Sequence, residues 1–349
     1  MERVRIAVIG AGLIGAKHAE LVRANGACEL VGICDTDTAR RRVAEALEVP
    51  FHTSADELIE REHPHGAIVA TPNSAHASAC IACAERGVHI LVEKPIADTL
   101  DNARQIIAAA SQHGISVLVG HHRRHNPLVR KTRDLLRDGT LGTLIGFSAL
   151  WTLLKPDDYF QAAWRRERPG GGPLLINLIH DLDSLRFICG EVKSIYARMS
   201  SSARGFPVED SLTISLTMES GALGTILASD AAPAPWSYEA TAGENPAYFH
   251  AAESCYHFVG TNASLAFPRM ELWRYPESAP RGWTHPLECR RIEVRLADPL
   301  EAQLEHFCRV IRGEHEPLIG PEDATRSLAV ALAAGESTRA GAAVEPAAV

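Results

Sequence analysis

Short apolar segments alternate with amphipathic segments over the first 120 residues. Apolar runs begin near residues 3, 28, 66, 88 and 116, and most are followed by a stretch whose apolar positions recur every three or four residues. The runs are apolar throughout, which is typical of strands covered by helices on both faces. This strand–helix rhythm predicts a doubly wound parallel sheet.

Beyond residue 122 the pattern changes to longer runs that suit an antiparallel sheet. We expect a hairpin turn at Gly221 and a long lid or binding loop over 231–250, which is rich in proline, glycine and aromatic residues. Strands are expected at 144–153, 192–201, 211–220, 222–230 and 292–296, and helices near 173–188, 301–312 and 322–338.

The length also indicates two domains, because 349 residues exceed what one core usually fills. The change of pattern places the domains at 1–122 and 123–349. The fold class is therefore α/β, with a parallel sheet first and a mainly antiparallel sheet second.

A glycine-rich turn lies directly between the first predicted strand and the first predicted helix. It reads Gly10-x-Gly12-x-x-Gly15 and includes Leu13 and Ile14. The first glycine permits the tight turn, the second lets the backbone approach a pyrophosphate, and the third allows close helix–strand packing. We therefore expect these five residues to contact a dinucleotide.

The second strand ends at Asp35, twenty residues after Gly15. An acidic residue at about that distance binds the ribose hydroxyls of the adenosine half of the cofactor. Its negative charge also repels a 2′-phosphate, which favours NAD. Arg40 lies one turn further on, and its positive charge could offset this repulsion, so NADP stays an alternative.

Charge and composition exclude several classes of protein. The net charge is -8, which gives no basic footprint for nucleic acid, although a local anion site stays open. No apolar run approaches the ~20 residues of a membrane span. The chain begins without a signal-peptide pattern, so we expect a cytoplasmic protein. Cys80 and Cys83 form an isolated C-x-x-C within a helix, which we interpret as packing, and we expect no metal site.

Four motifs in order are similar to those of one oxidoreductase family. After the glycine turn come "ATPNSAH" at 70–76, "EKP" at 93–95, and "GGG" at 170–172 before a helix with "HDLD" at 180–183. The set resembles the glucose–fructose oxidoreductase / inositol dehydrogenase / rhizopine-catabolism (Gfo/Idh/MocA) family over essentially the whole chain. The resemblance implies a nicotinamide-dependent enzyme with a Rossmann domain and a second α/β domain. The large, open, mainly antiparallel sheet of that second domain commonly forms subunit interfaces, so we expect a homodimer or homotetramer.

The E-K-P motif carries the main catalytic expectation. From the residues alone, Lys94 is also typical of a solvated lysine in a turn that Pro95 ends. In the family, the matching lysine lies near the nicotinamide and the reacting carbon. The resemblance therefore implies acid/base work by Lys94, contact of Glu93 and Lys94 with the cofactor, and a Lys94–Pro95 bond for which the cis form is reasonable.

The stretch 70–76 carries further expected cofactor contacts. In the family this loop passes the cofactor and the nicotinamide region. A plain turn, with Asn73 capping the next helix, is compatible with the same residues. The expected contacts are Thr71, Pro72, Asn73 and His76.

The chain departs from the family pattern before its second catalytic position. Aligning on His180 places Ile176 where the family usually has an aspartate, and isoleucine transfers no proton. Asn177 is three residues before His180, on the same helix face, so we expect it to orient substrate or His180, although an amide is a poor proton acceptor. We expect a catalytic or substrate-binding role for His180, against the alternative of a buried structural histidine. Asp183 we expect to be structural.

Three weaker candidates complete the predicted substrate site. Trp164 and Arg165 match a "WR" that often precedes the family's glycine run. His122 belongs to "HHRRHNP" at 121–127, which marks the domain crossover. Its basic residues either reach an anion or a polyhydroxylated substrate, or form a hydrogen-bonded hinge.

The resemblance implies hydride transfer between NAD(P) and a secondary hydroxyl or carbonyl of a sugar, cyclitol or related polyol. We expect a small polyhydroxylated substrate and no nucleic-acid or membrane partner. One alternative is a reductase of another carbonyl or a dihydrodiol substrate. A second is an NAD(P)-binding sensor without turnover, which Ile176 favours.

Overall fold

The computed structural model describes residues 2–168 and 170–349, and the chain forms two compact units. The first unit runs to His122 and includes Leu300–Leu328, whereas the second contains Arg123–Pro299 and Ala329–Ala348. The predicted division at residue 122 does not assign 300–328 to the first unit. Gly66 explains this docking, because a Cβ atom there would lie 2.6 Å from the Ile311 side chain.

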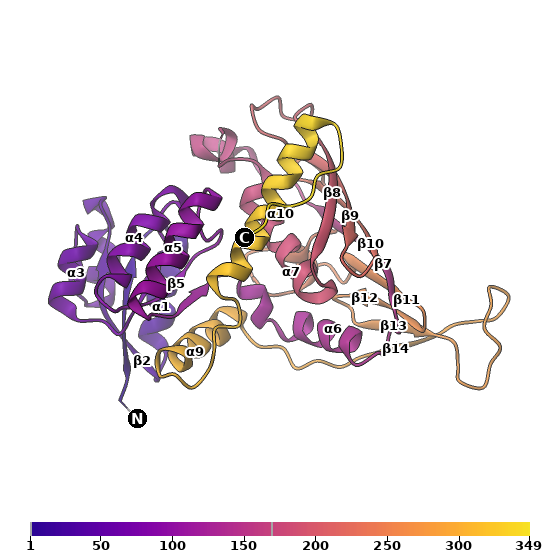
Figure 1. Ribbon diagram of the computed structural model, residues 1–349, viewed down its shortest axis with the longest axis horizontal. Coiled ribbons are helices and arrows are strands. Elements are labelled where there is room, and N and C mark those ends of the chain that lie inside the picture. Colours follow the sequence, from indigo (N-terminus) through magenta and orange to yellow (C-terminus); the bar gives the residue numbers. More distant parts are fainter. Residues whose placement is uncertain (1, 169) are drawn as a thin grey trace. The chain divides into compact units, whose positions relative to one another are not determined.

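The first unit contains a six-stranded parallel sheet (Figure 1). Its strands are β1 (Val4–Ile9), β2 (Cys28–Cys34), β3 (Phe51–His52), β4 (Gly66–Val69), β5 (His89–Val92) and β6 (Val117–Val119). The spatial order is β3-β2-β1-β4-β5-β6, so the chain reverses direction across the sheet between β1 and β4. In such sheets ligands bind beyond the carboxyl ends of the strands, at this point of reversal.

Helices connect these strands. The unit contains α1 (Leu13–Ala24), α2 (Arg41–Leu47), α3 (Ala55–Glu62), α4 (His76–Ala84), α5 (Leu100–His113) and nearly all of α9 (Pro299–Ile311), with short 3-10 turns at Thr38–Arg40 and Asn73–Ala75. A third 3-10 turn, His122–His125, begins at the last residue of this stretch and continues into the second unit. Local signals set their ends. Thr99 caps α5 by accepting a hydrogen bond from the Asn102 amide, and Gly114 ends it in the left-handed conformation.

The second unit contains an eight-stranded sheet. Its strands are β7 (Leu144–Thr152), β8 (Val192–Ser200), β9 (Ser211–Met218), β10 (Leu223–Ser229), β11 (Tyr256–Gly260), β12 (Ala263–Phe267), β13 (Glu271–Arg274) and β14 (Glu288–Arg291). The order is β14-β13-β12-β11-β7-β10-β9-β8, and every pair except β10–β7 is antiparallel. The expected Rossmann-type sheet and mainly antiparallel sheet are both confirmed, as is the β9–β10 hairpin at Gly221.

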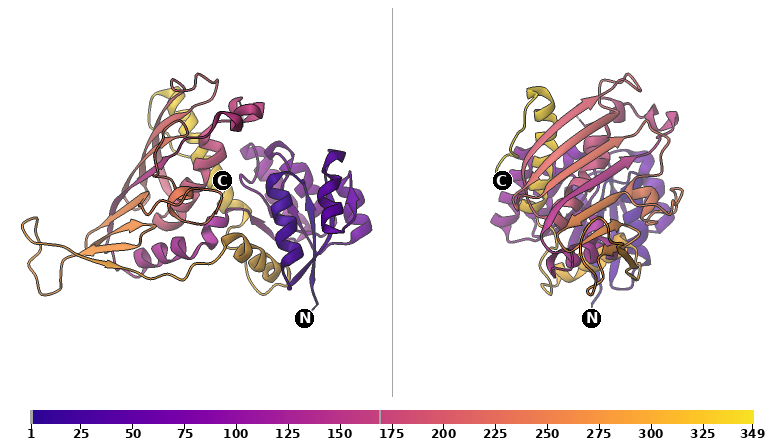
Figure 2. Two further views of the ribbon diagram at one scale, coloured as in Figure 1. Left: turned by 180° about the vertical axis from the view of Figure 1, so that it is seen from behind. Right: turned by 90° about the vertical axis from the view of Figure 1, so that its right-hand side faces the viewer.

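Helices cover only one face of this sheet. They are α6 (Pro127–Arg137), α7 (Ile179–Cys189) and, of α10 (Pro321–Ala340), the part from Ala329 onward that belongs to this unit, all on the same side of the strands (Figures 1 and 2). Alternate strand residues such as Trp151, Ile214 and Phe258 form a core against them. The opposite face carries Leu223 and Leu227 largely exposed, and it faces the viewer in the right panel of Figure 2.

Three segment predictions were wrong or incomplete. Residues 292–296 form no strand, because the pairing ends with β14 at Arg291. Strands β11, β12 and β13 were not predicted. The loop 231–250 contains the short helix α8 (Tyr238–Thr241), which Ser237 caps. Within the described residues, none of the helices combines the length and apolarity that crossing a bilayer would require.

Candidate active site

The glycine turn joins β1 to α1 at the carboxyl edge of the first sheet. Gly10 has a φ of +95°, and a Cβ atom there would lie 2.6 Å from the carbonyl carbon of Ala70. At Gly15 a Cβ atom would lie 1.8 Å from the Gly10 oxygen. At Gly12 it would meet no atom within 4 Å. Packing therefore requires Gly10 and Gly15. Gly12 leaves open space beside the backbone, as a pyrophosphate site needs.

The beginning of α1 presents backbone donors and no negative charge. Gly12 is its N-cap and has no side chain to satisfy the first amides, and the first turn contains no acidic residue. Leu13 is 89% exposed, and Ile14 is exposed as well. These features fit the binding of phosphates at a helix N-terminus.

Asp35, just beyond β2, is fixed beside this turn. Its two oxygens accept hydrogen bonds from the amides of Ala11, at 2.7 Å, and Asp37, at 2.9 Å. Each oxygen keeps a further lone pair, so the carboxylate can still accept ribose hydroxyls. Arg40 lies 3.6 Å from the Asp37 carboxylate, so its charge is directed to Asp37. The arrangement favours NAD over NADP.

The loop after β4 passes the same edge. Thr71 follows β4 closely, and its buried hydroxyl has no hydrogen-bond partner within the described chain. Pro72 is the N-cap of the 3-10 turn Asn73–Ala75, and no side chain caps that turn. No side chain caps α4 either, so Asn73 does not act as a cap, and the Thr71 hydroxyl stays available for another partner.

His76 ties this loop to the E-K-P turn. Its Nδ1 lies 2.9 Å from the Pro95 carbonyl oxygen and its Nε2 lies 3.0 Å from the Thr71 carbonyl oxygen. Burial lowers the pKa of His76, so the neutral ring donates to one carbonyl at a time. Both ring nitrogens face the main chain, which leaves no polar atom for a cofactor. The expectation of a direct cofactor contact by His76 is not supported, and its position is that of a clamp.

Lys94 follows β5, and Glu93 fixes the turn that holds it. The Glu93 carboxylate accepts from His18 Nε2 at 2.7 Å and from the Lys94 amide at 3.2 Å, and the Lys94–Pro95 bond is cis. Burial raises the pKa of Glu93, but the hydrogen bond from His18 and the charges of His18, Lys94 and His122 outweigh it and lower the pKa to about 2. Glu93 is therefore an inward-facing anion that holds the turn, and Lys94 is half-buried at the sheet edge.

In the second unit, an irregular turn precedes α7. Residues Leu174–Leu178 form one π-helical turn, and such insertions occur frequently at functional sites. The Glu209 carboxylate accepts from the Leu174 amide at 3.0 Å. Ile176 and Asn177 are partly exposed on this turn, and His180 is 9% exposed in the first turn of α7.

The structure joins Asn177 to a lysine that sequence reasoning missed. Lys155 Nζ donates to Asn177 Oδ1 at 2.7 Å and lies 3.6 Å from the Asp230 carboxylate. Burial lowers the pKa of Lys155 to about 8, against the raising effect of Asp230. The available signal was Lys155-Pro156 shortly after a predicted strand, the same dipeptide as in the E-K-P motif.

Arg165 lies in the same cluster, and its guanidinium carbon is also 5.5 Å from the centre of the Trp164 ring, although Trp164 is 56% exposed. The Arg165 guanidinium carbon is 4.0 Å from the centre of the Tyr159 ring, and Lys155 Nζ is 4.5 Å from that centre. The Nη1 group of Arg165 donates to the Tyr159 carbonyl oxygen at 2.7 Å. Two predicted substrate residues, Arg165 and Asn177, thus meet through Tyr159 and Lys155.

The arginines of the crossover segment are used structurally. Arg123 lies 3.1 Å from the Asp181 carboxylate, and Arg124 forms a bidentate pair with Asp183 at 2.7 and 2.9 Å. All four side chains are buried. Both arginines therefore anchor the crossover to α7. His122 is half-buried at the end of the first unit.

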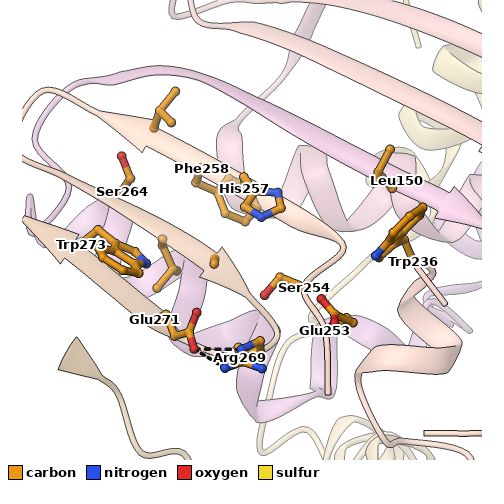
Figure 3. A pocket seen from close by; sticks show the side chains of 13 residues that line it. Leu150, Trp236, Glu253, Ser254, His257, Phe258, Ser264, Arg269, Glu271 and Trp273 are labelled. Atoms are coloured by element: carbon orange, nitrogen blue, oxygen red, sulfur yellow. Dashed lines mark hydrogen bonds and ion pairs between the residues drawn. The ribbon is translucent and has the colours of Figure 1, made fainter. Parts of the chain in front are cut away.

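A hollow of about 510 Å³ lies on the uncovered face of the second sheet (Figure 3). Leu150, Trp236 and Trp273 line it, and the Arg269–Glu271 pair, at 2.6 Å, lies at one side. It contains none of the predicted site residues. Among the residues that the structure describes, no three His, Cys, Asp or Glu side chains gather as a metal site.

Two family models match successive parts of the chain. Residues 4–121 match the family model described as "Oxidoreductase family, NAD-binding Rossmann fold". Residues 129–266 match the model described as "GFO/IDH/MocA C-terminal domain". Both belong to the family that the motifs resemble.

Individual relatives are distant. The chain is 29% identical to 1,5-anhydro-D-fructose reductase of Ensifer adhaerens, over 96% of this chain and 97% of the relative. It is 28% identical to 2,7-anhydro-N-acetylneuraminate hydratase of Mediterraneibacter gnavus, where the match covers 61% of this chain and only 57% of the relative. The structure is similar to the WlbA dehydrogenase of Bordetella pertussis, with a TM-score of 0.78, 21% identity and 99% of each chain covered. At that identity the likeness describes the fold.

Proposed function

Because the chain belongs to the Gfo/Idh/MocA oxidoreductase family, whose N-terminal domain is an NAD-binding Rossmann fold, we propose that it acts on sugar-like substrates. It transfers hydride between NAD(P) and a secondary hydroxyl or carbonyl group of a sugar, cyclitol or related polyol. The near full-length match to a relative named 1,5-anhydro-D-fructose reductase supports a sugar-derived substrate.

The turn after β5 is the observation that carries this proposal. Lys94 follows a strand at the carboxyl edge of the sheet that also carries the glycine turn and Asp35. Glu93 and His76 hold the surrounding backbone from two sides. An amine on such a rigid turn is suited to proton transfer at a substrate oxygen.

The proposed chemistry needs one proton transfer for each hydride. When bound, the nicotinamide ring accepts or supplies the hydride. Lys94 takes the hydroxyl proton when an alcohol is oxidised, and returns it when a carbonyl is reduced. His180 binds the reacting oxygen or its neighbour. Asn177 positions substrate as a hydrogen-bond donor, because its oxygen is already engaged by Lys155.

Ile176 favours a second candidate, a cofactor-binding sensor without turnover. The family pattern has an aspartate at this position, and an isoleucine neither accepts a hydrogen bond nor transfers a proton. The presence of both Lys94 and His180 favours the enzyme. Catalytic turnover distinguishes the two candidates.

Assembly and location belong to the same proposal. The uncovered sheet face exposes Leu223 (62%), Leu227 (46%) and Trp273 (40%), which supports a homodimer or homotetramer that buries this face. The structure describes all eight cysteines as free thiols, seven of them buried or half-buried, which is compatible with the reducing cytoplasm.

The first experiment follows the absorbance of reduced nicotinamide with purified protein. NAD and NADP are offered separately with sugars, cyclitols, sugar lactones and dihydrodiols, and the reverse reaction is run with keto-sugars. We expect turnover with at least one sugar or cyclitol and a preference for NAD, because of Asp35. Binding of NAD by calorimetry without turnover in either direction would instead support the sensor.

A further inference from the structure

Lys155 and Arg165 both lie against the Tyr159 ring, and Lys155 also holds Asn177, so three linked side chains offer hydrogen-bond donors. We call Lys155, Arg165 and Asn177 the donor cluster. Lys155 is only 7% exposed, and its ammonium contacts both the Asn177 amide oxygen and the Tyr159 ring. Arg165 lies against the same ring. The whole cluster belongs to the second unit.

Within the donor cluster, the one acceptor, the Asn177 amide oxygen, is already hydrogen-bonded, whereas several N–H donors are not. An ammonium group has three N–H donors and no acceptor, so it turns the amide oxygen of Asn177 toward itself and the amide NH₂ away. Arg165 Nε is buried and has no hydrogen-bond partner within the described chain. A buried donor without an acceptor destabilises the protein, because it has lost its hydrogen bonds to water. A ligand with acceptor oxygens satisfies these groups.

The charge of Lys155 is only partly compensated. Asp230 is its nearest carboxylate, but Asp230 already pairs with Arg204 at 3.0 Å. Glu239 also acts on Lys155, but its carboxylate accepts from Arg123 at 2.8 Å and from Trp151 at 2.9 Å. The positive charge of Lys155 is therefore available to a bound anion.

Ile176 removes the main obstacle to an anion at this place. The family aspartate would stand next to Asn177 in the sequence, on the same π-helical turn. Its negative charge would repel an anion and accept hydrogen bonds from hydroxyl groups instead. Isoleucine is neutral and adds no charge beside Asn177, and the Glu209 carboxylate at the start of the turn is already bound to the Leu174 amide.

We propose that the donor cluster binds a carboxylate of the substrate, so that the protein acts on acidic sugars such as uronic or aldonic acids. This rests on the proposed function, because only that function assigns Asn177 and Arg165 to the substrate site. It names a narrower substrate class and a residue, Lys155, that determines specificity. The lowered pKa of Lys155, about 8, leaves the amine mostly protonated at pH 7.

The test measures binding of acidic and neutral sugars to the full chain saturated with NAD. Calorimetry at pH 7 compares D-galacturonate, D-glucuronate and D-gluconate with D-galactose, D-glucose and D-glucitol. We expect at least one acid to bind about tenfold more tightly than its neutral counterpart. Lys155→Met should remove this preference, and Lys155→Arg should retain part of it. Lys193→Met, at an exposed lysine of β8, is the matched control and should change nothing.

Three results overturn the inference. They are equal binding of acids and neutral sugars, binding of neither class, and an acid preference that survives Lys155→Met. Far-ultraviolet circular dichroism checks that each variant folds. If Lys155→Met does not fold, the same binding preference is measured with Arg165→Met, which lies on a partly exposed turn and should also weaken it. Turnover, followed separately by absorbance, distinguishes the two proposals. If neutral sugars are oxidised and acids are not preferred, the proposed function holds and the carboxylate subsite is wrong. If acids bind but are not turned over, the carboxylate subsite holds and the proposed function is wrong.

Discussion

Two Lys-Pro turns, one in each unit, place the same dipeptide in opposite environments. Lys94-Pro95 follows β5, and Lys94 is half-buried on a backbone that Glu93 holds. Lys155-Pro156 follows β7, and Lys155 is 7% exposed and anchored through its own side chain to Asn177. The first lysine is placed by a turn whose backbone Glu93 holds, whereas the second is held at the tip of its side chain. We therefore propose proton transfer for the first lysine and substrate recognition for the second.

Removing each amine in turn is the strongest test of this difference. Lys94→Ala should lower kcat about 10²–10⁴-fold, because a general acid/base is lost, while NAD affinity changes little. Lys155→Ala should instead raise KM for an acidic sugar by roughly 10–100-fold and leave kcat nearly unchanged. Steady-state kinetics on the same substrate measure both values. Lys193→Ala is the control, and equal losses of kcat in the Lys94 and Lys155 variants would abolish the distinction.

The support of the first turn can be broken separately. Glu93→Gln replaces a buried carboxylate that pairs with His18, and should lower the free energy of unfolding by about 3 kcal/mol at pH 7. Because folding lowers the pKa of Glu93 from 4.5 to about 2, its stabilisation is complete above pH 4.5 and is lost as the pH falls toward 2. Urea unfolding at a series of pH values measures the difference.

The same experiment has an internal control. Glu20→Gln, on the exposed side of α1, should change the free energy of unfolding by less than about 0.5 kcal/mol. A Glu93→Gln variant as stable as the wild type at pH 7 would mean that the turn does not depend on this pair. A destabilisation that stays constant from pH 7 to pH 2 would contradict the assigned ionisation of Glu93.

The two turns differ in how far the sequence predicts them. The glycine turn, Asp35 and the E-K-P motif are local patterns whose spacing carries their meaning, and the structure places them at one sheet edge. Lys155 acquires its environment from Asn177, 22 residues later, and from Asp230, which only the folded sheet brings close. No local pattern contains those pairings.

Two features of the fold, the strands β11 to β13 and the docking of α9, could not be predicted from local sequence patterns. Strands β11 to β13 are only four or five residues long, so their alternation is too brief to separate from a loop. The helix α9 is amphipathic, but its periodicity does not say which sheet it covers. Its docking on the first unit follows from the space that Gly66 leaves for Phe307 and Ile311.

The smallest expected effect concerns the charge that faces Lys155. The negative charge of Asp230 raises the pKa of Lys155, so Asp230→Asn should bring that pKa below about 8. Binding of D-galacturonate needs the protonated amine. The wild type should therefore lose affinity as the pH rises through 8, and the variant should lose it at a lower pH. Calorimetry between pH 6 and 9.5 locates both transitions.

Asp157→Asn is the matched control for this shift, because Asp157 approaches the same Arg204 at 3.9 Å but its side chain is fully exposed. Water screens an exposed charge, so this variant should titrate like the wild type. Coincident transitions in the wild type and Asp230→Asn would mean that binding does not follow the protonation of Lys155. If Asp230→Asn instead loses affinity at a higher pH than the wild type, Asp230 repels the substrate more strongly than it stabilises the protonated amine. The Lys155 ammonium would then lie away from the bound carboxylate.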